Sequence, residues 1–256
     1  MKKIYILTIF PDVINSYVKV GVIKEAKKKK KAEVIALDLR KFADKGQVDD
    51  LAYGGHPGMV IKPEPVFRAY EYVSKGSSPF VIITEPWGRT LTQDLVEEIS
   101  RHESIMIIAG RYEGVDERVK AITDLEVSVG DFILSGGELP ALMIAESVVR
   151  LIPGVLGDPE SLRRDSFRGK WLGCPAFTRP REFRGMKVPE VLTSGNHQLI
   201  ELWQLYESIK RTLKWRPSSV PEKLTEVEKS MIESIIRGEE FDLWLQKNAK
   251  LLKISS

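Results

Sequence analysis

Short apolar runs rich in β-branched residues alternate with helical segments through the first two-thirds of the chain, and this alternation constrains the fold most strongly. The runs at 3–9, 34–39, 80–84, 105–109 and 125–129 predict strands, several of them apolar on both faces. Helical patterns lie near 13–30, 64–73, 92–100 and 114–123, and a buried helical stripe occupies 139–152. We therefore predict an α/β domain with a mostly parallel sheet covered by helices.

The sequence changes in character after residue 152. Residues 153–180 are rich in proline and glycine and show little periodicity, which predicts a linker or a functional loop. Beyond residue 189 the pattern is helical, over 197–214, 225–237 and 240–252, and Thr225 with Glu228 forms a capping box. We predict an α/β domain at 1–158, an interdomain loop at 159–175 and a small all-α domain at 176–256.

Cysteine and histidine usage excludes several kinds of site. Cys174 is the only cysteine, so an internal disulfide and a thiolate zinc site are excluded. His56, His102 and His197 are far apart and lack ligand spacing. No stretch approaches the ~18 apolar residues of a membrane helix, and the N-terminus lacks a signal-peptide cleavage site. We expect a cytoplasmic protein with no membrane partner.

The distribution of charge along the chain indicates binding partners better than the net charge of +3 does. Between Ser161 and Lys187, eight basic residues stand against two acidic ones, a local charge of +6. Such a segment is the expected footprint of contact with phosphates, although a solvated charged loop explains the composition equally well. For the five lysines at 27–31, a solvated helix end favoured by the macrodipole is the better explanation.

Glycines gather directly after three of the predicted strands, in TEPWG at 84–88, GRYEGVD at 110–116 and GDFILSGGE at 130–138. In open α/β sheets, ligands bind outside the carboxyl ends of the strands, and glycine lets the backbone approach closely. The loops therefore favour a nucleoside-like cofactor, with three ordinary tight turns as the alternative. Dinucleotide, P-loop and hydrolase motifs are absent from the sequence.

Several long motifs also carry a resemblance to a known family. GRYEGVDERV, SVGDFILSGGELPALM, RLIPGVLG, RRDSF, CPAFTRPREFRG and VPEVLTSGNH, with VDDLAYGGHPGMV and IYILTIFP, resemble the TrmD family. These are bacterial tRNA guanine-37 N1-methyltransferases of the SPOUT class. The resemblance runs from Ile4 to about Leu252. It implies a parallel α/β domain with a C-terminal trefoil knot, which periodicity would not predict because true knots are rare.

The resemblance implies that S-adenosylmethionine binds in the knot, at the interface of a homodimer whose active site lies between the subunits. Magnesium is associated with the family's activity, but the sequence shows no ligand cluster for it. The implied cofactor residues are Thr84, Glu85, Pro86, Gly110, Tyr112, Glu113, Gly114, Ser128, Val129, Gly130, Asp131, Phe132, Ile133, Leu134, Gly136 and Gly137.

The resemblance also assigns roles in catalysis and tRNA binding. Asp165 would be the general base at N1 of guanine 37, and Arg150 would stabilise charge on O6. The preceding guanine, at position 36 of the anticodon stem-loop, would meet Asp50 and a loop that contains Gly54, Gly55 and Gly58. Further tRNA contacts would come from Arg163, Arg164 and Arg168, and the helical domain at 176–256 would be the tRNA-binding domain.

The residues by themselves leave simpler roles open. Asp165 lies among arginines and suits a surface ion pair, while Arg150 stands four residues after Glu146, the spacing of a helical ion pair. Glu113 and Asp116 suit helix caps. For the whole protein, the alternatives are a SPOUT methyltransferase acting at another RNA position and an RNA-binding or antitermination-type module without activity.

Overall fold

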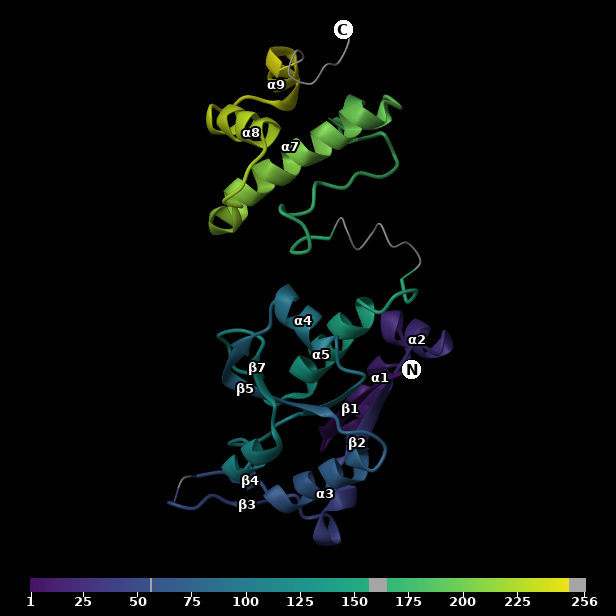
Figure 1. The fold of residues 1–256 in the computed structure, drawn as a ribbon, viewed down its shortest axis with the longest axis vertical. Helices are drawn as coiled ribbons and strands as arrows, with labels where there is room; N and C mark the ends of the chain where they lie inside the picture. The colour runs from purple at the N-terminus through teal and green to yellow at the C-terminus, as the bar shows by residue number, and fades with distance from the viewer. Residues whose placement is uncertain (56, 157–164, 249–256) are drawn as a thin grey trace. The chain divides into compact units, whose positions relative to one another are not determined.

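The computed structural model describes residues 1–55, 57–156 and 165–248 (Figure 1). The chain divides into two compact units, residues 1–159 and 160–256, and each is described by itself. No helix within the described ranges is long and apolar enough to cross a bilayer.

A five-stranded parallel sheet forms the centre of the first unit. Its order is β2-β1-β6-β5-β7, and every neighbouring pair is parallel. All five predicted strands are confirmed, and the middle strand is buried along its whole length, as its continuous apolar run predicts. The strands are β1 (Lys2–Thr8), β2 (Ala32–Asp38), β5 (Phe80–Thr90), β6 (Ser104–Ile108) and β7 (Leu125–Ser128).

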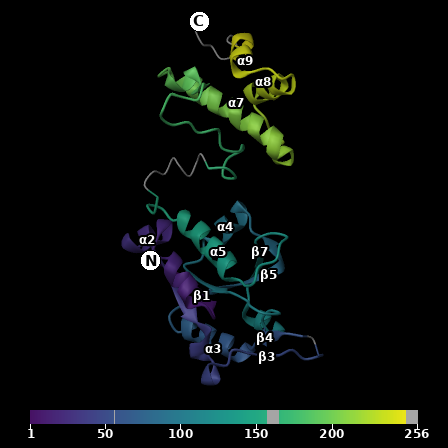
Figure 2. The ribbon, with the colours of Figure 1, turned by 180° about the vertical axis from the view of Figure 1, so that it is seen from behind.

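Side chains alternate between two hydrophobic cores, one on each face of the sheet. Ile105 and Ile107 of β6 join one core, whereas Met106 and Ile108 join the other. Figures 1 and 2 show α4 and α5 on the opposite side of the sheet from α3. The first core is covered by α1 (Pro11–Tyr17), α2 (Gly21–Lys28), α4 (Gln93–Ile99) and α5 (Glu138–Arg150), and the second by α3 (Pro63–Ser74).

Two predicted helices differ from the structure. The helix expected at 13–30 is two helices, α1 and α2, because Gly21 has a left-handed backbone (φ +60°) that interrupts the helical path. The helix expected at 114–123 is a shorter 3₁₀ helix, η3 (Glu117–Ile122). Val115 is held in a β-bridge with Ile61, so the helix begins only at Glu117. The Asp116 side chain caps it, one of the two caps that the sequence suggested.

An antiparallel hairpin that the sequence analysis missed follows the second strand of the sheet. It consists of β3 (Asp49–Leu51) and β4 (Met59–Ile61). Its strands have three residues each, too few to show an alternating pattern. The connecting loop holds Gly54, Gly55 and Gly58, all with positive φ, whereas His56 lies outside the described residues.

The second unit is built on α7 (His197–Trp215), α8 (Glu226–Ile236) and α9 (Phe241–Asn248). Tyr206, Met231 and Trp244 are fully buried between these helices. The capping box of Thr225 and Glu228 is confirmed at the start of α8. The end of the last predicted helix, at 249–252, lies outside the described residues.

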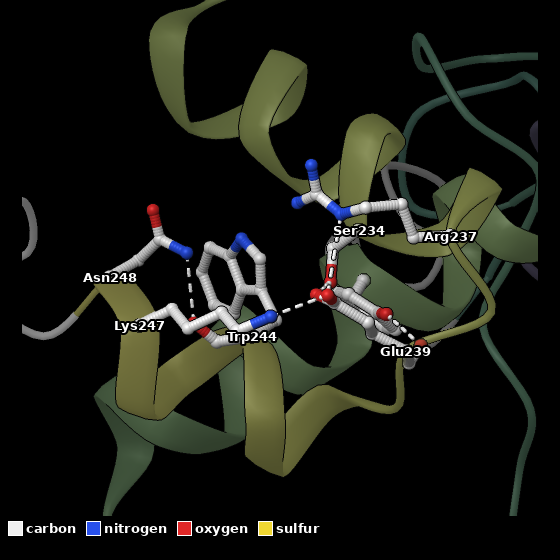
Figure 3. A network of polar contacts seen from close by, with 7 residues as sticks. Ser234, Arg237, Glu239, Trp244, Lys247 and Asn248 are labelled. Carbon is white, nitrogen blue, oxygen red and sulfur yellow. Dashed lines mark hydrogen bonds and ion pairs between the residues drawn. The ribbon is translucent and has the colours of Figure 1, made fainter.

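Polar contacts close the turn between α8 and α9 (Figure 3). Glu239 accepts hydrogen bonds from Ser234 and Arg237 and pairs with Lys247, and these groups hold its pKa at about 2, with Lys247 the largest cause. Trp171 packs against the same unit and donates a hydrogen bond from Nε1 to Glu228 at 2.9 Å. Part of the segment predicted as an interdomain loop therefore packs as part of the second unit.

Candidate functional site

A pocket opens at the carboxyl ends of β5, β6 and β7, where the sequence places its three glycine-containing loops. Every predicted cofactor residue lines this pocket except Asp131 and Ile133, and the Ile133 side chain is 85% exposed. The structure thus brings together residues that are far apart in the chain. Five further residues of the wall were not among the implied cofactor residues, although three of them lie in the predicted loops: Trp87, Arg111, Val127, Ser135 and Pro140.

The first wall of the pocket is an irregularity within β5. Thr84 and Arg89 both lie opposite Val127 of β7, so residues 85–88 bulge out of the strand. The sequence predicted that the strand ends at residue 84, whereas β5 resumes and continues to Thr90. The bulge includes Pro86, which has no N–H for the ladder, and lines the pocket with Glu85, Pro86 and Trp87.

The loops after β6 and β7 meet at Gly136 and Gly137. The Gly137 N–H donates to the Gly110 carbonyl at 2.8 Å, and Gly136 forms a β-bridge with Arg111. A Cβ at Gly137 would lie 2.2 Å from Thr84 Oγ1 and 2.8 Å from the Ala109 Cα. Only glycine fits here, which explains why the sequence has glycine immediately before α5.

A buried carboxylate stabilises this contact between the two loops. Glu138, the first residue of α5, is 3% exposed and accepts a hydrogen bond from Thr8 Oγ1 at 2.8 Å. Its other oxygen lies 3.1 Å from Arg111 Nε, and the Arg111 guanidinium lies 4.5 Å from the centre of the Phe10 ring. Because both partners of the ion pair are held, Arg111 is fixed against the pocket wall.

The β5 bulge itself carries a second acidic group, Glu85. The pKa of Glu85 is raised to about 7, chiefly by burial and then by the neighbouring Glu126 carboxylate, while Lys120 opposes the shift. Glu126 accepts a hydrogen bond from Trp87 Nε1 at 2.6 Å and lies 3.5 Å from Lys120 Nζ. Near neutral pH, Glu85 therefore changes its charge in the wall of the pocket.

The loop predicted to contact guanine 36 is tied to the pocket by β4. The Glu113 N–H donates to the Met59 carbonyl at 3.0 Å, and the Ile61 N–H donates to the Gly114 carbonyl at 3.0 Å. A Cβ at Gly58 would lie 2.6 Å from Glu113 Cγ. Asp50, on β3, is exposed on the same hairpin.

The remaining predicted site residues lie in both units. Arg150 is the exposed last residue of α5, and Glu146, its proposed ion-pair partner, accepts a hydrogen bond from the Tyr17 hydroxyl. Asp165 and Arg168 belong to the second unit, where the Arg168 N–H donates to the Asp165 carbonyl at 3.4 Å. Arg163 and Arg164 lie outside the described residues.

Metal ligands do not gather anywhere in the part of the chain that the structure describes. No group of three or more His, Cys, Asp or Glu side chains there is arranged to hold a metal ion. The pocket offers backbone groups and apolar side chains instead, which suits a nucleoside.

Comparison with known proteins gives the same family throughout. The family model described as tRNA (Guanine-1)-methyltransferase TrmD matches residues 1–222. The tRNA (guanine-N(1)-)-methyltransferase of Aquifex aeolicus (strain VF5) is 57% identical over 251 residues, 98% of each chain. That of Persephonella marina is 52% identical over 250 residues, which cover 96% of this chain and 98% of the relative.

A solved structure also matches the fold. The crystal structure of tRNA (m1G37) methyltransferase from Aquifex aeolicus has a TM-score of 0.72 and 56% identity, covering 89% of this chain and 99% of that one. The parallel sheet with its pocket at the strand ends, followed by a helical unit, defines a SPOUT-type methyltransferase. The chain belongs to the TrmD family of tRNA (guanine-N1)-methyltransferases, which confirms the resemblance in the sequence.

The Gly137→Ala substitution should abolish cofactor binding, because its methyl group would push the loops after β6 and β7 apart. Titration calorimetry with S-adenosylmethionine measures this, and circular dichroism monitors the fold. Gly76→Ala is the control, since its nearest neighbour is the Val73 carbonyl at 3.8 Å. If Gly137→Ala binds S-adenosylmethionine with unchanged affinity, close contact between the two loops is not required for cofactor binding.

Glu85→Gln should alter how the free energy of unfolding depends on pH. The unfolded carboxyl loses its proton near its ordinary pKa of 4.5, whereas the folded one keeps it up to about 7. Across that window the folded state binds more protons, so the Glu85 contribution to stability falls as pH rises. Urea unfolding at about pH 5 and about pH 8 should show the variant gaining stability relative to the native chain as pH rises. The opposite trend would mean that the folded state favours the ionised carboxylate.

Proposed function

We propose that this protein transfers the methyl group of S-adenosylmethionine to N1 of guanine 37, in tRNAs with guanine at position 36. The observation that carries the proposal is the pocket at the ends of β5, β6 and β7, in a chain of the TrmD family. Relatives that are 57% and 52% identical over nearly their full length are named tRNA (guanine-N(1)-)-methyltransferases.

The pocket suits the cofactor because backbone forms much of its wall. Gly110, Gly136 and Gly137 let the backbone line the pocket without side chains, and Phe132 and Leu134 supply apolar surface for an adenine ring. When bound, S-adenosylmethionine supplies a methyl group that its sulfonium already activates. We also propose a trefoil knot at this site, and a requirement for magnesium.

The chain's own residues must remove a proton and control charge. Guanine N1 carries a proton at neutral pH, and negative charge builds on N1 and O6 as that proton leaves. Asp165 would accept the proton, and Arg150 would stabilise the charge on O6. Asp50 and the loop of Gly54 to Gly58 would hold the neighbouring guanine, which leaves the target base free to enter the pocket.

An exposed apolar surface supports the proposed homodimer. α1 packs against α5, and both helices expose apolar side chains at helical spacing, Val13 and Tyr17 on α1 and Leu139 and Met143 on α5. The exposed Phe132 to Leu134 loop leads from the pocket to α5. A second copy on this surface would therefore bury apolar side chains and lie beside the pocket.

Asp165→Asn should reduce kcat by about 10²- to 10⁴-fold, the usual contribution of a general base, while cofactor affinity is retained. Turnover on a tRNA transcript and calorimetry with S-adenosylmethionine measure the two effects. Asp242→Asn, an exposed aspartate of α9, is the control. Near-native turnover of Asp165→Asn would contradict the assignment.

A transcript with adenine in place of guanine 37 completes this experiment. Loss of methylation supports the proposed target, whereas undiminished methylation would indicate a SPOUT enzyme acting at another position. A native protein that binds tRNA but never methylates it would be an RNA-binding module.

Leu139→Glu should dissociate the dimer and abolish methylation, because a charge would be buried in the apolar surface. Sedimentation velocity measures the mass, and Leu243→Glu, at an exposed leucine of α9, is the control. A native chain that is active as a monomer would contradict the homodimer.

A further inference from the structure

A small hairpin in the second unit has an unusual surface. It consists of β8 (Glu182–Phe183) and β9 (Met186–Lys187). Arg184 and Gly185 form the turn with φ of +52° and +79°, as the two central residues of a type I′ turn require. The Val188 N–H donates to the Arg181 carbonyl at 2.9 Å, which extends the ladder by one pair. The register of the hairpin is therefore fixed.

The two faces of this hairpin differ. Directly opposed residues of an antiparallel pair share a face, so Glu182 and Lys187 lie on one side, where their charges are 3.9 Å apart. Phe183 and Met186 lie on the other side, and their side chains are 56% and 65% exposed. The Arg184 guanidinium lies 5.2 Å from the centre of the Phe183 ring.

This second face is both apolar and cationic. It consists of Arg181, Phe183, Arg184 and Met186. Arg181 joins it because residues two apart on a strand point the same way. Neither Phe183 nor Met186 belongs to the core of the second unit, and within the described residues the hairpin pairs with no other strand. The surface is thus exposed in the single chain.

The positive charge of the hairpin limits the kinds of partner that this face would bind. Residues 179–187 contain four basic side chains and one acidic one, and that acid is paired on the opposite face. A suitable partner carries negative charge and offers a flat ring to stack on Phe183. Single-stranded RNA has both, as phosphates beside unstacked bases.

We propose that the Phe183 face stacks an unpaired base of the tRNA, with Arg181 and Arg184 beside the flanking phosphates. The inference rests on the proposed function, because it takes tRNA as the substrate. Stacking of this kind acts in binding and takes no part in the chemical step. It therefore affects KM for tRNA and leaves kcat nearly unchanged.

The test uses the full chain with Phe183→Ala, Phe183→Trp and the control Ile236→Ala, an exposed apolar residue of α8 in the same unit. Phe183→Ala should raise the Kd and KM for tRNA about tenfold. Phe183→Trp and Ile236→Ala should leave both constants near native values, and all three variants should bind S-adenosylmethionine normally.

The Arg184→Asn variant distinguishes the contribution of charge to tRNA binding from the contribution of base stacking. Asparagine accepts the left-handed backbone and makes an Asn-Gly turn, so the hairpin keeps its shape while one cation is removed. The slope of log Kd against log salt should fall by about one for Arg184→Asn. It should not change for Phe183→Ala.

If the native chain binds tRNA and Phe183→Ala binds it with the same affinity, the inference is overturned and the proposed function is left intact. Weaker binding accompanied by dissociation of the dimer in sedimentation would also overturn it, because the face would then contact a second subunit. A native chain that fails to bind tRNA would overturn both the inference and the proposed function.

Discussion

The contact between the loops that follow β6 and β7 is the constraint on which the rest of the first unit depends. The Gly137 N–H meets the Gly110 carbonyl, and no Cβ fits beside Thr84 Oγ1. This close approach sets where α5 begins, and α5 covers one face of the sheet. The same contact forms the floor of the pocket, so the fold and the binding site depend on one backbone arrangement.

Buried charge makes this arrangement specific. Glu138 accepts from Thr8 at the end of β1 and pairs with Arg111 after β6, so it joins three segments that are distant in sequence. A buried carboxylate that lost these partners would be costly, which disfavours other placements of α5. The pocket wall contains a contrasting carboxyl, Glu85, whose burial raises its pKa to about 7. One acid is thus held by its partners, and the other changes its charge near neutral pH.

The exposed apolar side chains indicate where further surfaces meet. One set on the first unit follows α1 and α5 and includes the Phe132 to Leu134 loop beside the pocket. On the second unit Phe183 and Met186 stand among arginines. We proposed a second subunit as the partner of the first set, and for the second set a partner that is both flat and anionic.

Patterns within the sequence predicted the five strands, α5 and the helices of the second unit, because apolar runs and helical periodicity are local. Glycines directly after three strands predicted the loops of the pocket. The sequence also determined the family, through long motifs. The folded chain alone revealed the break at Gly21, the three-residue strands β3 and β4, and the resumption of β5 after its bulge. It likewise added Arg111 and Trp87 to the pocket wall. The bulge and the pocket wall depend on contacts between residues distant in the chain, and local patterns do not encode such contacts. The break at Gly21 is a local backbone conformation that glycine permits but does not require.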